Sequence, residues 1–214
     1  KLVMNLNNGK MDIAPFTANL AGGSITTNLT LDGSNGKTAS LSKQVTIKQL
    51  ELGQLPQFKG KDTIVGGTTD LTMNLTGSGI SVADIMSDSN GKILVTTGTG
   101  KLLNKTIDIA GADIVFNALN MMNPLSEQDE YTSLECGVVK FDIKDGIATT
   151  DRGIALQTGK MNIIGSGTLN FKTEAIDLAV KPQAREGLGI SLGSLVDAVS
   201  IGGTFADPSP KVDS

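Results

Sequence analysis

The chain has 214 residues, enough for one large domain, and carries a formal net charge of −4. This acidic balance argues against a nucleic-acid-binding surface or an anionic-membrane footprint, because both require clustered lysine and arginine. With no histidine and a single cysteine, the chain cannot build a histidine-based triad, a histidine zinc site or an internal disulfide.

Runs that alternate apolar and polar residues recur along nearly the whole chain, starting at residues 2–6. Alternation with a period of two is typical of strands in a sheet with one dry face and one wet face. The runs lie at 11–20, 25–31, 41–47, 71–75, 93–95, 107–109, 139–143, 154–156, 161–163, 169–171 and 176–180. Short connections between them predict on the order of twelve to fifteen strands in an antiparallel meander. The expected fold class is therefore mainly β.

Two or three short helices interrupt this rhythm. A capping-box pattern at Ser81 predicts a helix over 81–86. A second helix is expected over 112–122, where Pro124 ends an apolar stripe formed by Ile114, Val115, Ala118, Leu119 and Met122. We interpret this stripe as a plug at one end of the sheet, with a lipid gate as the alternative. A third, weaker helix pattern covers 192–199.

Residues that could carry chemistry are sparse, and ordinary structural roles account for them. Asp32, Asp145 and Asp207 each precede Gly or Pro, where aspartate caps turns. Cys136 has no histidine to activate it, and we interpret it as a small core residue near a turn. The glycine-rich segments lack the spacing of phosphate-binding loops. We therefore expect neither an enzyme nor a bound metal or cofactor.

Several glycine-marked segments occur in a definite order along the chain. They are GGSI at 22–25, GGTTDL at 66–71, NLTGSG at 74–79, NGKI at 90–93, FDIKDGIAT at 141–149, GSGTL at 165–169 and GTFADP at 203–208. Each segment alone is common in hairpins. The ordered series, with a helix at 81–86 between the expected strands, resembles the C-terminal region of the AsmA family, which is related to larger TamB-type envelope proteins.

The resemblance implies that residues 1–214 form a single AsmA-like C-terminal β domain within a longer protein. It implies an inner-membrane anchor N-terminal to this segment, a location in the periplasm, and a curved antiparallel sheet that forms a groove. Such a groove would carry phospholipid acyl chains toward the outer membrane. A protein partner in the outer membrane or elsewhere in the envelope is also implied, and nucleic acid is not expected.

The apolar side of the alternating strands is the candidate lining of this groove. It consists of Ile25, Leu29, Leu31, Leu71, Met73, Leu75, Val139, Phe141, Ile143, Met161, Ile163, Leu169, Phe171, Ile176, Leu178 and Val180. The pattern alone favours the closed core of a β-sandwich, whereas the resemblance favours an open trough in which Ile163 and Val180 remain accessible. Two other functions stay open: a structural or adhesive β-module of the cell envelope, and a scaffold that assists outer-membrane protein assembly by strand addition.

Overall fold

In the computed structural model, one large β-sheet dominates the described residues, which are 1–56, 58, 64–103, 130–159, 161–185 and 199–211. The strands of this part of the chain are β1 (Leu2–Asn7), β2 (Lys10–Leu20), β3 (Gly23–Asp32), β4 (Ala39–Glu51), β5 (Ile64–Gly66), β6 (Thr68–Gly79), β7 (Asn90–Thr97), β8 (Gly100–Leu103), β9 (Tyr131–Lys144), β10 (Ile147–Thr158), β11 (Met161–Asn170), β12 (Ala175–Ala184), β13 (Val199–Gly203) and β14 (Pro208–Lys211). A 3-10 turn, η1 (Leu52–Gln54), and a helix, α1 (Val82–Ser87), accompany them.

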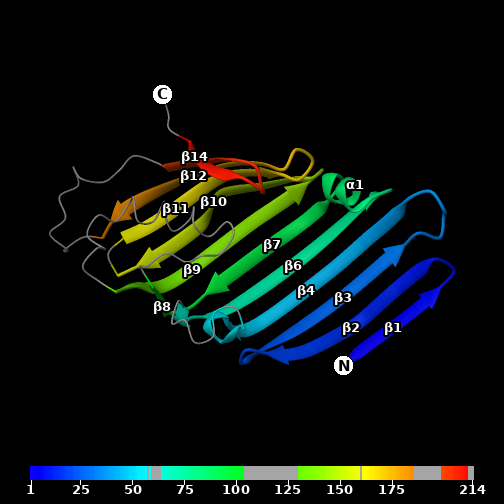
Figure 1. The fold of residues 1–214 in the computed structure, drawn as a ribbon, viewed down its shortest axis with the longest axis horizontal. Coiled ribbons are helices and arrows are strands. Elements are labelled where there is room, and N and C mark those ends of the chain that lie inside the picture. Colours follow the sequence, from blue (N-terminus) through cyan, green and yellow to red (C-terminus); the bar gives the residue numbers. More distant parts are fainter. Residues whose placement is uncertain (57, 59–63, 104–129, 160, 186–198, 212–214) are drawn as a thin grey trace.

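The strands follow one another across the sheet almost in sequence order (Figure 1). The order is β1-β2-β3-β4-β6-β7-β9-β10-β11-β12-β13-β14, and every pairing along it is antiparallel. Strands β5 and β8 lie off this path, where β5 pairs with β8 and β8 pairs with β9. The predicted mainly β, antiparallel meander is confirmed, while the strand predicted at 107–109 lies outside the described residues.

Two-residue turns set the register of several hairpins. Positive φ angles at both turn residues occur at Asn8 and Gly9 (47° and 77°) and at Asp145 and Gly146 (50° and 74°). This geometry matches the right-handed twist of the flanking strands and favours Asn-Gly and Asp-Gly sequences. In the connection between β3 and β4, Asp32 accepts hydrogen bonds from the backbone N–H and hydroxyl of Ser34. The predicted turn roles of Asp32 and Asp145 are confirmed.

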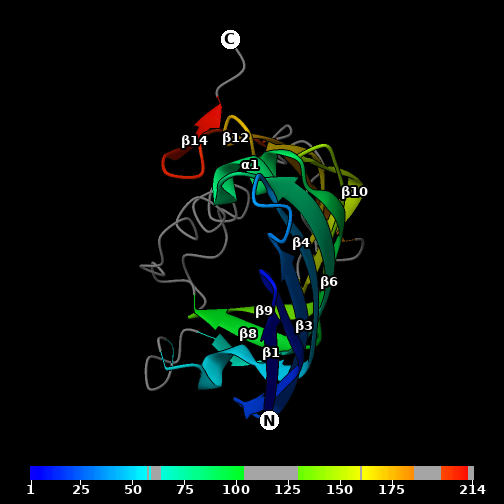
Figure 2. The same ribbon diagram turned by 90° about the vertical axis from the view of Figure 1, so that its right-hand side faces the viewer.

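The sheet is curved, and α1 lies on its inner side (Figure 2). Ser81 caps the helix by accepting a hydrogen bond from the Asp84 N–H, as the capping-box pattern predicts. The helix packs against β6 where Gly77 and Gly79 have no side chains, since a Cβ at Gly77 would lie 2.4 Å from the Ile85 carbonyl oxygen. The predicted helix at 81–86 is thus confirmed to within a residue.

The other two expected helices lie almost entirely outside the described residues. The stripe of Ile114, Ala118, Leu119 and Met122 falls outside the described residues. The third pattern, over 192–199, also falls there except for its last residue. Val199 belongs to β13, where it pairs with Val180, so the prediction of a helix reaching this residue is wrong.

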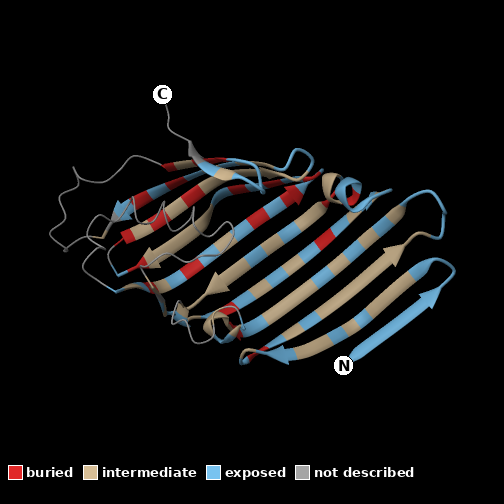
Figure 3. Ribbon diagram, in the orientation of Figure 1, coloured by how far each residue is buried: buried red, intermediate tan, exposed pale blue. Residues whose placement is uncertain are grey.

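Buried apolar residues form two clusters on strands between β6 and β13 (Figure 3). One cluster consists of Met161, Ile163, Val180, Val199 and Ile201. The other consists of Leu75, Phe141, Ile143 and Ala148, with partly buried neighbours that include Met86 of α1. Burial therefore increases along the sheet from β1 toward β13.

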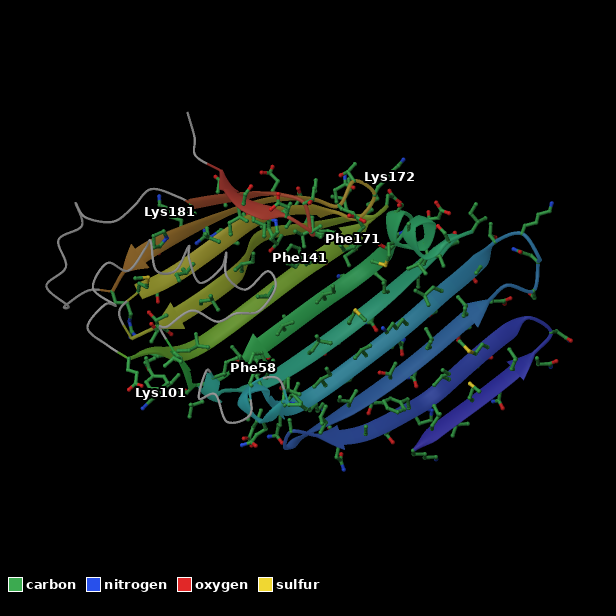
Figure 4. All side chains as sticks on the ribbon, in the orientation of Figure 1. Phe58, Lys101, Phe141, Phe171, Lys172 and Lys181 are labelled. Atoms are coloured by element: carbon green, nitrogen blue, oxygen red, sulfur yellow. The ribbon has the colours of Figure 1, made fainter. Side chains whose placement is uncertain are left out.

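Two residues lie elsewhere than the sequence suggested. Cys136 is exposed on β9, with its Sγ 3.7 Å from Gln157 Oε1, so the prediction of a core thiol is wrong. Phe171 lies in the turn after β11 and not on a strand; its N–H donates to the Gly146 carbonyl and its ring centroid is 6.0 Å from that of Phe205. Figure 4 shows Phe171 close to Phe141, with which it shares a cluster.

Candidate functional site: the inner apolar face of the sheet

The backbone register places apolar residues side by side across the sheet. A row of directly paired residues runs through Ala18, Ile25, Ile47, Leu71, Val95, Val139, Ile154, Gly165, Val180 and Val199. Directly paired residues point to the same side of a sheet. We call this side the inner face, because α1 covers part of it and lies inside the curve (Figure 2).

The opposite side, here called the outer face, is largely polar. One of its rows runs through Asn28, Gln44, Asn74, Lys92, Asp142, Thr149, Thr168 and Asp177. The Lys140 and Lys92 ammonium groups lie 3.3 and 3.5 Å from the Asp142 carboxylate. Hydrogen bonding from Lys140, supported by both positive charges, holds the pKa of Asp142 below its ordinary value. Charge is thus accommodated on the water-facing side.

The register brings together all but one of the residues predicted to line a groove. Phe171 is the exception because it lies in a turn, although its side chain packs against the buried cluster that contains Phe141. The other predicted residues share the inner face, from Ile25 on β3 to Val180 on β12. Their role as lipid contacts remains a prediction.

Exposure of the inner face changes from one end of the sheet to the other (Figure 3). On β1, the inner-face residues Leu2, Met4 and Leu6 are 60%, 57% and 73% exposed. On β11 and β12, Ile163 and Val180 are 2% and 9% exposed. The expectation that Ile163 and Val180 line an open trough is therefore wrong: they lie in a packed cluster. The accessible part of the inner face belongs to the N-terminal strands.

Several residues of the inner face were not among the predicted site residues. They are Leu2, Met4, Leu6, Met11, Ile13, Leu41, Lys43, Val45, Ile47, Ile93 and Val95. The signal that identifies them is present in the sequence, because each continues the apolar alternation of its strand or, as with Lys43, interrupts it at an apolar position. Lys43 is the informative omission, since it places a charge among aliphatic side chains.

The described part of the chain contains no group of three or more carboxylates or thiols that could hold a metal ion. No helix among the described residues is long and apolar enough to span a membrane. Within this part of the molecule, the broad apolar surface is the feature that needs a functional explanation.

Comparison with known proteins identifies the family of the chain. The family model described as "AsmA family" matches residues 1–152. The chain is also 26% identical over 211 residues to the AsmA family protein YhjG of Escherichia coli (strain K12). That match covers 97% of this chain and 29% of the relative, so the chain spans less than a third of that protein's length. No solved structure matches the chain. Because the family model covers well over half of the residues, the chain belongs to the AsmA family.

Proposed function

We propose that this domain binds phospholipid acyl chains on its inner face and contributes to phospholipid transport toward the outer membrane. The observation that carries the proposal is the apolar row crossing the sheet from β2 to β13, backed by a polar outer face. In this proposal the domain lies in the periplasm and belongs to a longer protein anchored in the inner membrane. It acts as a surface and not as an enzyme.

Family membership supports an envelope role. It suggests a protein of the bacterial envelope with a function in lipid transport or assembly. AsmA family proteins are not known as enzymes. The inner face adds the physical reason for choosing lipid, because aliphatic side chains suit flexible chains and the composition is only 3% aromatic.

The dimensions of the sheet suit an acyl chain. A strand rises about 3.3 Å per residue, so the 12 residues of β6 extend for roughly 40 Å. Half of the hydrocarbon core of a bilayer is about 15 Å thick, which is the reach of one acyl chain. Exposing that chain to water costs about 0.8 kcal/mol per methylene. A continuous apolar face would recover part of this cost wherever the chain lay on it.

The exposure pattern locates the proposed contact. Side chains such as Ile163 are already packed and have little accessible surface that a ligand could cover. Leu2, Met4 and Leu6 are mostly exposed, and Ile25, Leu29, Leu71 and Met73 are partly exposed. We therefore assign the acyl-chain contact to the inner face of β1–β4, β6 and β7.

Photocrosslinking at two neighbouring positions of β6 tests the proposal. A photoreactive residue at Met73 lies on the inner face, and one at Asn74 lies on the outer face of the same strand. After irradiation in cells, we expect phospholipid adducts at position 73 that exceed those at position 74 by at least about tenfold. Mass spectrometry of the adducts checks this result.

Two outcomes would contradict the proposal. Equal capture at both positions would indicate nonspecific contact with membrane. Absence of adducts at position 73, in protein whose circular dichroism matches the wild type, would favour a structural or adhesive β-module instead.

A further inference from the structure

Lys43 is the single charged side chain among the described residues that the pairing register places on the inner face. It lies on β4 directly between Leu29 of β3 and Leu75 of β6. Its neighbours on the same side of β4 are Leu41 and Val45, because alternate residues of a strand share a face. Four aliphatic side chains therefore surround a partly buried lysine.

The charge of Lys43 is not balanced within the described part of the protein. Ion pairs there join Lys10 to Asp12, Lys92 and Lys140 to Asp142, and Arg185 to Glu135, and none includes Lys43. An ammonium group among apolar side chains is unfavourable unless an anion pairs with it. Because the surrounding inner face is apolar, we expect an anionic ligand to pair with Lys43.

We propose that Lys43 binds the phosphate of an anionic phospholipid whose acyl chains lie on the surrounding aliphatic residues. This proposal rests on the proposed function and adds a substrate class to it. A free phosphate ion would use the ammonium and gain nothing from the partly exposed side chains of Leu29, Leu41 and Val45. An amphipathic ligand uses both, because the charged and apolar parts of the site are adjacent.

The same face disfavours zwitterionic headgroups. A phosphatidylethanolamine headgroup carries an ammonium group beside its phosphate. Among the described residues, the inner-face positions set by the register offer no carboxylate to receive it, and Lys43 is the only charged residue there. An extra positive charge near Lys43 is repelled. A lipid with a net negative charge, such as phosphatidylglycerol, can bind at Lys43 without that repulsion.

The test measures which lipid is captured, using the photoreactive residue at position 73. The full chain is mixed with vesicles that contain equal amounts of phosphatidylglycerol and phosphatidylethanolamine, and the adducts are identified by mass spectrometry. Lys43→Gln should lower the ratio of phosphatidylglycerol to phosphatidylethanolamine adducts by about tenfold, the loss expected for one charge-assisted hydrogen bond. Lys43→Arg should keep the ratio.

Lys48→Gln is the matched control, because Lys48 is an exposed residue of the same strand and lies on the outer face opposite Ser24. Its ratio should equal that of the wild type. An unchanged ratio in Lys43→Gln, or an equal change in Lys48→Gln, would overturn the headgroup proposal while lipid capture itself persisted. Loss of all capture in the otherwise unsubstituted chain would instead overturn the proposed function.

Free phosphate provides the remaining arm of the test. Inorganic phosphate at concentrations that match the vesicle lipid should leave the adduct ratio unchanged, because it lacks the acyl chains. If it abolished the preference in the wild type, Lys43 would be a site for small anions and the lipid proposal would be wrong.

Discussion

Thr150 on β10 has a buried side chain whose hydroxyl oxygen has no hydrogen-bond partner in the described structure. It pairs with Gly167 of β11, which places it on the inner face. A buried polar group without a partner loses its hydrogen bonds to water and gains nothing in return. The buried hydroxyl of Thr150 therefore lowers the stability of the fold.

We expect Thr150→Val to raise the free energy of unfolding by about 1 kcal/mol, because valine has nearly the same shape and no group to desolvate. The neighbouring Thr149 is exposed on the outer face, so Thr149→Val should change stability by less than about 0.5 kcal/mol. Urea unfolding of both variants measures the difference. Destabilisation by Thr150→Val would mean that the hydroxyl forms a bond on which the fold depends.

Side-chain direction at single residues could be predicted from the sequence, whereas exposure could not. Alternation placed Met73 and Asn74 on opposite faces because successive strand residues point to opposite sides. Leu6 and Ile163 occupy equivalent positions in their alternating runs, yet they are 73% and 2% exposed. Their difference arises from the curvature of the sheet and the number of neighbouring strands, which depend on contacts distant in sequence.

The contact between α1 and β6 depends on the absence of side chains on the strand. At Gly79, a Cβ would lie 2.4 Å from the Asp84 Cβ, and at Gly77 it would meet the backbone of Ile85. Ile85 is the buried residue of the helix. The two glycines therefore set how closely the helix approaches the sheet.

Gly77→Ala should lower the free energy of unfolding by about 1–3 kcal/mol, because the added methyl group overlaps backbone atoms that cannot move independently. Gly33→Ala is the control, since a Cβ there would meet only the Gly9 carbonyl oxygen at an ordinary 3.7 Å. Thermal unfolding monitored by circular dichroism compares the two. Equal effects would indicate that the loss of glycine flexibility, and not the helix contact, determines the cost.

The helices and hairpins that could be predicted from the sequence are those specified by residues within the element itself. The helix at α1 has its own cap, and the hairpin at Asp145 and Gly146 has its own turn residues. Strands β5 and β8 were missed because each is only three or four residues long and pairs with a distant segment. Short strands of this kind depend on the partner that the fold brings to them.

At the scale of the whole molecule, the sheet combines two packing regimes on one continuous face. The buried clusters around Phe141 and Ile163 stabilise the C-terminal strands. The N-terminal strands carry the same alternation without comparable cover, as Leu6 and Phe16 show. In our proposal, the sheet uses one end as a core and presents the other end as a binding surface.

This division predicts that a charge placed on the N-terminal part of the inner face blocks lipid movement without unfolding the protein. Leu71 lies in the apolar row of β6, is only partly buried and belongs to neither buried cluster. Leu71→Asp should slow lipid transfer between donor and acceptor vesicles by at least about tenfold, because an acyl chain passing over it must desolvate a carboxylate. Thr72→Asp adds the same charge to the exposed outer face of the same strand and should leave transfer unchanged. If both variants keep the wild-type circular dichroism spectrum and transfer lipid at equal rates, acyl chains do not travel over the inner face.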